Sequence, residues 1–333
     1  MAYRGRFTWI FHLYFGMTSQ ILTGKDELTV ASFALSDVSP KDKHWDRLRA
    51  ATDEVRDLYT DIDHTDYADR MSQCSNRLTF SLCRQLNNEE LKFILLGARF
   101  CRVRHCPVCQ SRKTMMWRAR FFKVIPKILQ DYPSARFLFL TLTLKNCRLE
   151  NLRGTIQHMN KAWRKLVRRK SFPAIGWIKS IEITRGKDGL AHPHFHIILM
   201  VKTTYFNKGY YLSQQDWTEL WRQSLKVDYY PIVNVKAIKG KGDQDAIFIA
   251  LCETLKYSVK EEDLKFDKHW LEGLTKQLHG TRSIGIGGVF KDYLSEDEPE
   301  DLIHTDTEEE DIPEDAPEFS FTWKEMITKY MSE

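Results

Sequence analysis

Apolar positions along the chain alternate with the period of strands in some stretches and with the period of helices in others. Residues 76–84 and 91–100 are strand-like runs on either side of the polar sequence QLNNEE, which predicts a β-hairpin. A basic amphipathic helix is predicted over residues 112–132, and a buried strand rich in β-branched and apolar residues over residues 135–146.

The second half of the chain continues this alternation. A helix over residues 149–170 is followed by two strands within residues 176–201, joined by the turn sequence GKDG, so these strands form a second hairpin. A helix capped by Ser213, a strand over residues 230–238 and a helix over residues 243–262 complete the pattern. This order predicts an α+β fold in which helices pack on an antiparallel sheet.

Charge is distributed unevenly along the 333 residues. Residues 296–333 carry fifteen Asp and Glu against two Lys, whereas the whole chain has a formal net charge of +5, so the other 295 residues carry +18. A basic body with interleaved Trp, Tyr and Phe favours a nucleic-acid partner over a membrane surface. No apolar run reaches the roughly 18 residues that a membrane-spanning helix needs, so we expect a soluble protein.

Seven cysteines, three of them in the sequence CRVRHCPVC, fit metal ligation in a reducing cytosol better than a disulfide framework. Cys101, Cys106 and Cys109 supply three thiolates, whereas a closed structural zinc site takes four ligands. If the first hairpin turns near residue 88, Cys74 lies beside this cluster and Cys83 lies at the far end of the ribbon. We therefore expect Cys74 to complete a structural zinc site; the alternative is three free buried thiols.

Three histidines occupy alternate positions in the sequence AHPHFHIIL, so His192, His194 and His196 share one face of a strand. Desolvated imidazoles need partners, and a cation is a common one, although a solvated sheet edge gives the same pattern. With the turn at GKDG, Glu182 lies almost opposite His194. Two imidazoles and this carboxylate would suit Mg²⁺ or Mn²⁺. Alternatively, Glu182 is an ordinary exposed strand residue, and His192 or Asp188 takes its place.

The helix predicted over residues 243–262 offers a nucleophile. Glu253, Tyr257 and Lys260 are spaced i, i+4 and i+7, so they line one helix face. A phenol with a pKa of about 10 attacks well at neutral pH only where a cation stabilises the phenolate, a role open to Lys260. Because a carboxylate raises the pKa of a phenol, Glu253 is expected to activate water as a general base instead. Any charged helix can contain this spacing.

Three sequences occur in a recognisable order: FLFLTLTLKN, HPHFH and ETLKYSVK, preceded by FCRVRHCPVCQSRK and followed by GTRSIGIGGVFKDYL. In this combination, residues 70–293 resemble the rolling-circle replication initiators of bacterial plasmids, the Rep family of HUH endonucleases. The resemblance implies that His194 and His196 bind a divalent metal, that Tyr257 is the nucleophile and that Glu253 activates the terminating water. The single tyrosine is similar to the one-tyrosine branch of that family.

The resemblance also implies a transesterification at the plasmid origin. Tyr257 would attack one phosphodiester of single-stranded or hairpin-extruded DNA, keep the 5′-phosphate and free a 3′-OH that primes the host polymerase. Glu253 would later let water end the round of replication. A transposase or mobilisation relaxase of the same superfamily is the alternative with the same chemistry. A zinc-dependent DNA-binding regulator without catalysis is the alternative from another class.

Basic residues in two places are expected to contact DNA. One group flanks the cysteines and is expected to bind duplex DNA; the other lies in the helix over residues 149–170 and is expected to follow a DNA backbone. The predicted DNA-binding residues are Arg102, Arg104, Arg112, Lys113, Arg164, Lys165, Arg168 and Arg169. The expected partner is plasmid origin DNA in the bacterial cytoplasm, with a host helicase and polymerase as further partners.

Four segments are expected from these patterns. Residues 1–60 form a partly helical leader, with an amphipathic helix over residues 43–62, and residues 61–120 form the zinc-binding β-hairpin module. Residues 121–295 form the nicking and strand-transfer domain. Residues 296–333 form an acidic, disordered tail that ends in a short aromatic segment, interpreted as a docking peptide.

Overall fold

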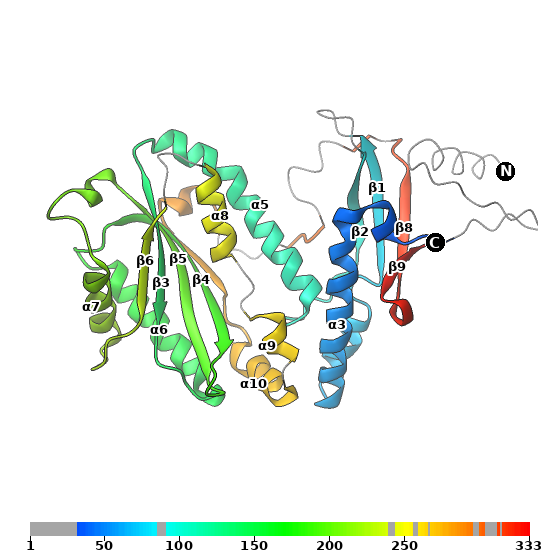
Figure 1. Ribbon diagram of the computed structural model, residues 1–333, viewed down its shortest axis with the longest axis horizontal. Helices are drawn as coiled ribbons and strands as arrows, with labels where there is room; N and C mark the ends of the chain where they lie inside the picture. The colour runs from blue at the N-terminus through cyan, green and yellow to red at the C-terminus, as the bar shows by residue number, and fades with distance from the viewer. Residues whose placement is uncertain are drawn as a thin grey trace, which may run out of the picture.

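The computed structural model describes residues 32–84, 91–238, 244–255, 259–265, 267–295, 300–303, 312–313 and 315–333. Its elements form two lobes, each built on an antiparallel sheet, and helix α5 (Pro107–Asp131) runs from one lobe into the other (Figure 1). The predicted α+β class is therefore confirmed. None of the helices in the described part of the chain is both long enough and apolar enough to cross a membrane.

The larger lobe contains a five-stranded sheet with the strand order β6-β3-β5-β4-β7, in which every neighbouring pair is antiparallel. Its strands are β3 (Arg136–Thr143), β4 (Ala174–Arg185), β5 (Ala191–Val201), β6 (Val233–Ala237) and β7 (Ile284–Gly288). Strands β4 and β5 form the predicted second hairpin. The histidine strand, β5, therefore lies at the centre of the sheet.

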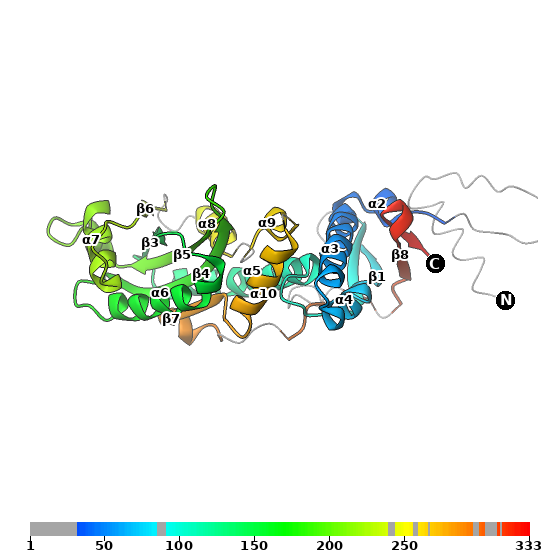
Figure 2. The ribbon, with the colours of Figure 1, turned by 90° about the horizontal axis from the view of Figure 1, so that it is seen from below.

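Side chains alternate along each strand, so the two faces of this sheet pack against different helices. The rear face carries Leu140 and Ile197 and packs against α6 (Leu152–Val167) and α7 (Gln214–Leu225). Helix α10 (Lys268–Leu278) packs against α6 and lies between the two lobes (Figure 1). The opposite face, here called the site face, carries Phe137 and Ile198 under α5 and α8 (Gln244–Thr254). Figure 2 shows α6 and α8 on opposite sides of the sheet.

Helix α6 forms because its apolar residues recur at helical spacing and fit the rear face. Each of them is at most 3 % exposed: Leu152, Ile156, Met159, Trp163 and Leu166. The expected Ser213 cap of α7 is also present, as a capping box with Asp216. Helix α10 and the short helix α9 (Glu261–Lys265) were not predicted as separate elements.

In the described part of the chain, the smaller lobe combines a four-stranded sheet of order β2-β1-β8-β9 with three helices. The strands are β1 (Arg77–Arg84), β2 (Leu91–Ala98), β8 (Glu318–Lys324) and β9 (Lys329–Ser332). The helices are α2 (Leu35–Val38), α3 (His44–Asp61) and α4 (Thr65–Ser72). The predicted hairpin corresponds to β1 and β2, whose register places Leu78 opposite Ala98.

The end of the chain differs from the prediction of a disordered tail with a docking peptide. Strand β8 lies between β1 and β9, with Phe319 and Phe321 buried in the core of the smaller lobe. The Trp323 indole donates a 2.8 Å hydrogen bond to Asp53 of α3. The sequence FSFTW therefore alternates because it is a half-buried strand. Helix α3, assigned to the leader, belongs to this same lobe. The acidic residues 304–311 lie outside the described residues.

The short 3-10 helices of the described chain connect these elements. They are η1 (Pro40–Lys43), η2 (Leu149–Asn151), η3 (Thr203–Phe206), η4 (Val289–Asp292) and η6 (Glu325–Ile327).

Candidate metal centres and catalytic site

Glu182, His194 and His196 meet on the site face. Glu182 and His194 are directly opposed in the β4–β5 register, as the turn position predicted. Glu182 Oε2 lies 3.1 Å from His194 Nε2 and 2.8 Å from His196 Nε2. The side chains are only 9 to 12 % exposed, so the alternatives of a solvated edge and of an exposed Glu182 are wrong.

The hydrogen bonds of His194 test whether this group fits a cation. Its Nδ1 lies 3.2 Å from the carbonyl oxygen of His192, and its Nε2 faces the Glu182 carboxylate, so both ring nitrogens face acceptors. A neutral imidazole carries one N–H and cannot donate to both. With a cation bound, Nδ1–H would donate to the carbonyl, while the Nε2 lone pair and the carboxylate would coordinate the ion. The residues therefore fit a divalent metal.

The electrostatics of Glu182 favour the same conclusion. Burial alone would raise the pKa of this carboxyl, but the hydrogen bonds and charges of His194 and His196 lower it well below its usual value. Glu182 is therefore ionised at neutral pH. One anionic oxygen and two imidazole nitrogens, all within 4.8 Å of one another, form a ligand set with room for further ligands.

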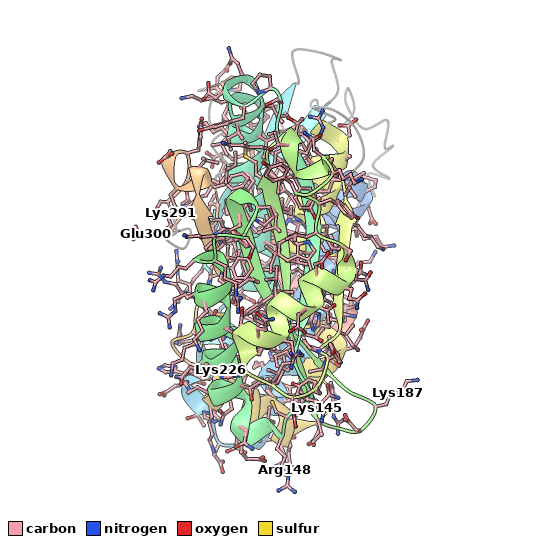
Figure 3. All side chains as sticks on the ribbon, turned by 90° about the vertical axis from the view of Figure 1, so that its left-hand side faces the viewer. Lys145, Arg148, Lys187, Lys226, Lys291 and Glu300 are labelled. Atoms are coloured by element: carbon pink, nitrogen blue, oxygen red, sulfur yellow. The ribbon has the colours of Figure 1, made fainter. Side chains whose placement is uncertain are left out.

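His192 and Asp188, the alternatives to Glu182, are engaged elsewhere. His192 Nδ1 lies 2.6 Å from Asn146 Oδ1, and the Asn146 amide donates to Asp188 at 2.9 Å. Burial, with the charge of His194, lowers the pKa of His192. Sequence reasoning missed Asn146, because no local pattern brings the end of β3 beside the β4–β5 turn. Figure 3 shows the labelled Lys145 and Lys187 at this end of the sheet.

The helix predicted to carry the nucleophile is shorter than expected. It ends at Thr254, and Val259 instead forms a β-bridge with Ile183 before α9 begins. The Ser180 hydroxyl donates to the Thr254 carbonyl, so the last residue of α8 is bonded to β4. Lys260 lies outside this helix, so Glu253 and Lys260 do not share one helix face as predicted.

The structure describes two of the three predicted catalytic residues. Glu253 is exposed in the last turn of α8, and Lys260 is exposed just before α9. Tyr257 lies outside the described residues. The chain on either side of it contacts β4 at Ser180 and Ile183, which lie on either side of Glu182 in the sequence.

Four cysteines converge in the smaller lobe. Cys74 Sγ lies 3.6 Å from the sulfurs of Cys106 and Cys109, and Cys101 Sγ lies 3.6 Å from that of Cys109. Tetrahedral zinc with bonds of about 2.3 Å requires sulfurs about 3.8 Å apart. Cys83 instead contacts Ser81 at 3.5 Å. The hairpin register thus brings Cys74 to the cluster, as predicted, and the four thiols fit a closed metal site.

Backbone groups around the cysteines favour thiolates. The amides of Arg102 and Val103 point at Cys109 Sγ and Cys101 Sγ, at 3.3 and 3.5 Å. Thr52 of α3 also lies 3.7 Å from Cys106 Sγ, which ties the supposed leader to the cluster.

The basic residues beside the cysteines do not form one DNA-binding surface. Arg112 is buried, and its guanidinium donates at 2.6 Å to the carbonyls of Leu302 and Ile303, so its predicted role in DNA binding is wrong. Arg104 is half-buried and donates to Thr281 and Ser283. Arg102 is exposed and donates to the Glu300 carbonyl, and Lys113 is half-buried. A charged residue in a basic stretch can thus hold two segments together.

The second basic group lies at the carboxyl end of α6. Arg164, Lys165 and Arg168 are exposed there, whereas Arg169 is half-buried and donates to Gln223 at 3.0 Å. Since α6 covers the rear face, this group is separated from the site face by the sheet (Figure 2).

The described residues define a two-lobed α+β protein with two candidate metal centres, one on a sheet face and one enclosed by cysteines. A family model described as "Replication protein" matches residues 92–331, more than half of the chain. The chain therefore belongs to this family of replication proteins, and its resemblance to plasmid rolling-circle initiators is confirmed.

Curated relatives agree with the family. A "Protein rep" of Streptococcus pneumoniae is 32 % identical over 286 residues, covering 82 % of this chain and 87 % of the relative. One of Lentilactobacillus hilgardii is 35 % identical over 272 residues, covering 77 % and 84 %. One of Lactiplantibacillus plantarum is 37 % identical over 227 residues, covering 63 % and 72 %. No solved structure matches the chain significantly.

Proposed function

We propose that the protein initiates plasmid replication as a metal-dependent endonuclease that nicks one DNA strand at the origin. The observation that carries this proposal is the convergence of Glu182, His194 and His196 on the site face. The chain segments that flank Tyr257 contact β4 at Ser180 and Ile183, next to that group. These contacts of the neighbouring described residues support Tyr257 as the nucleophile for a phosphate held at the three ligands.

The reaction is a transesterification. The Tyr257 phenol oxygen bonds to phosphorus and loses its proton, while the bond to the 3′ oxygen breaks and that oxygen takes up a proton. Mg²⁺ or Mn²⁺, when bound, withdraws electron density from the phosphoryl oxygens. The ionised Glu182 carboxylate supplies one negative charge and orients both imidazoles. Lys260, exposed beside the flanking segment, can neutralise phosphate charge.

Three further groups of residues complete the proposal. Glu253, at the exposed end of α8, acts as the general base that activates water to end replication. Cys74, Cys101, Cys106 and Cys109 bind a structural zinc ion, because four thiolates leave no position for a substrate. Arg102, Lys113 and the α6 group, Arg164, Lys165, Arg168 and Arg169, contact DNA phosphates.

The test is covalent capture. Incubation with Mn²⁺ and single-stranded oligonucleotides that tile the plasmid origin should give a nucleotide-bearing peptide containing Tyr257, identified by mass spectrometry. Tyr257→Phe should form no adduct, and Glu253→Ala should form it but lose turnover. Absence of any adduct with the unaltered protein would favour the non-catalytic DNA-binding regulator. Adducts at the ends of a transposable element instead of a plasmid origin would favour a transposase.

A further inference from the structure

A segment rich in aromatic residues follows β5 directly and takes no part in the proposed reaction. It consists of residues 202–211, sequence KTTYFNKGYY. Phe206, Tyr210 and Tyr211 are 43, 69 and 56 % exposed, an unusual density of large exposed side chains. We call these three residues, with Lys202 and Lys208, the aromatic surface.

A buried tyrosine fixes this segment to the larger lobe. Tyr205 is 3 % exposed; its hydroxyl donates to the Leu212 carbonyl and accepts from the Trp217 indole, at 3.0 and 3.2 Å. The Tyr205 ring contacts Phe206 and Tyr211, with centroids 5.0 and 5.6 Å apart. The exposed rings are therefore presented on a fixed support.

The charge around the aromatic surface is positive. The sequence has no Asp or Glu between Asp188 and Asp216, and Asp216 is engaged in the cap of α7. The register pairs Ala174, at the start of β4, with Val201, which brings the carboxyl end of α6 to the same end of the sheet. The cations that α6 and the following turn bring there are Arg164, Lys165, Arg168, Arg169 and Lys170.

This end of the sheet is remote from the candidate metal ligands. Six residues along β5 separate His196 from Lys202, which at about 3.4 Å per residue is roughly 20 Å. The β4–β5 turn and Lys187 lie at the other end (Figure 3). A molecule on the aromatic surface is therefore outside the nicking site.

We propose that the aromatic surface is a second binding site for single-stranded DNA. Exposed rings with interleaved lysines and adjoining arginines are the features that bind unpaired strands, because bases stack on the rings while cations contact phosphates. Duplex DNA, with its bases already stacked, would use the cations alone. The choice of DNA as ligand rests on the proposed function, whereas the location of the site rests on exposure and charge.

The experiment measures binding of fluorescent dT20 and of a 20-base-pair duplex to the full-length protein. Tyr210→Ala/Tyr211→Ala should weaken dT20 binding at least about fivefold, because unpaired bases can no longer stack on these two rings. Duplex binding should stay within twofold, because the bases of a duplex do not stack on the rings. Tyr230→Ala is the matched control, since Tyr230 is 73 % exposed just before β6. It should bind dT20 like the unaltered protein.

A second variant tests the cations without removing a ring. Lys202→Ala/Lys208→Ala should reduce the slope of log affinity for dT20 against log salt by about 1.4, the value for two phosphate contacts. Unchanged dT20 binding in both double variants would overturn the inference, as would an equal loss for duplex DNA. Failure of the proposed nicking function would be recognised by a different result: the unaltered protein would form no covalent adduct with DNA.

Discussion

Glu182 is the residue on which the candidate catalytic centre converges, since one of its oxygens faces both His194 and His196. Its position could be predicted from the sequence because a hairpin with a defined turn fixes which residues oppose each other. The network of Asn146, His192 and Asp188 could not, because it joins a loop to a turn 42 residues away. Local periodicity carries no information on such a contact.

Replacing the carboxylate tests its role as a ligand. Glu182→Gln keeps the shape but removes the charge, so Mn²⁺ binding measured by calorimetry should weaken at least about tenfold. Glu150→Gln, at an exposed position in η2, is the control and should bind Mn²⁺ normally. Unchanged affinity in Glu182→Gln would remove this residue from the ligand set.

The cysteines allow an equally direct test, because a non-ligand cysteine lies buried in the same lobe. Cys109→Ser should leave the purified protein without zinc, whereas Cys83→Ser, at a site 3 % exposed, should retain about one zinc per chain. Metal content measured by mass spectrometry distinguishes the two variants. Loss of zinc from both would place Cys83 among the ligands.

At the scale of elements, the period of the sequence predicted most helices and strands but not where α8 ends or where β8 pairs. The period of a helix continues past Thr254, yet Ser180 and Ile183 of β4 bind the chain there. Likewise, FSFTW predicts a strand only once its partner is known, and β1 lies about 240 residues earlier in the sequence. Both errors come from long-range contacts that override local preference.

Strands β8 and β9 should be essential to the smaller lobe. Truncation after residue 317 removes four buried aromatic side chains, worth roughly 1.5 to 3 kcal/mol each. This sum approaches the whole stability of a domain, which is about 5 to 15 kcal/mol. Calorimetry should therefore show loss of the unfolding transition of the smaller lobe. The removed aromatic residues are Phe319, Phe321, Trp323 and Tyr330.

A point variant controls for changes at the surface of these strands. Met326→Ser, at a position 99 % exposed, should unfold like the unaltered protein. A truncated protein with an intact transition would mean that β8 is dispensable. Deletion of all residues from 296 onward would remove these strands together with the acidic stretch.

At the scale of the whole molecule, α5 connects the cysteine cluster of the smaller lobe to the core of the larger lobe. Its first turn carries Cys109, directly after the capping Cys106, while Phe121, Ile125 and Ile128 pack in the core of the larger lobe. Binding of zinc should therefore order only one end of the helix.

Hydrogen exchange tests this separation. After zinc removal by a chelator, amides of residues 101–113 should exchange faster by at least about tenfold, while amides of residues 121–128 keep their protection. Mass spectrometry of peptides from both ends of α5 gives the comparison, and zinc added back should restore the slow exchange. Faster exchange along the whole helix would mean that the larger lobe also depends on zinc.

The length of α5 has a geometric consequence. Its 25 residues span about 37 Å at 1.5 Å per residue, the rise of about eleven base pairs of duplex. Because α5 is anchored in a hydrophobic core at each end, it holds the two lobes at a fixed separation. In the proposed nicking reaction, DNA that contacted both lobes would therefore be held at a fixed separation between its two points of contact. Insertions between the two contacted origin sequences would then change which phosphodiester lies at the proposed catalytic site.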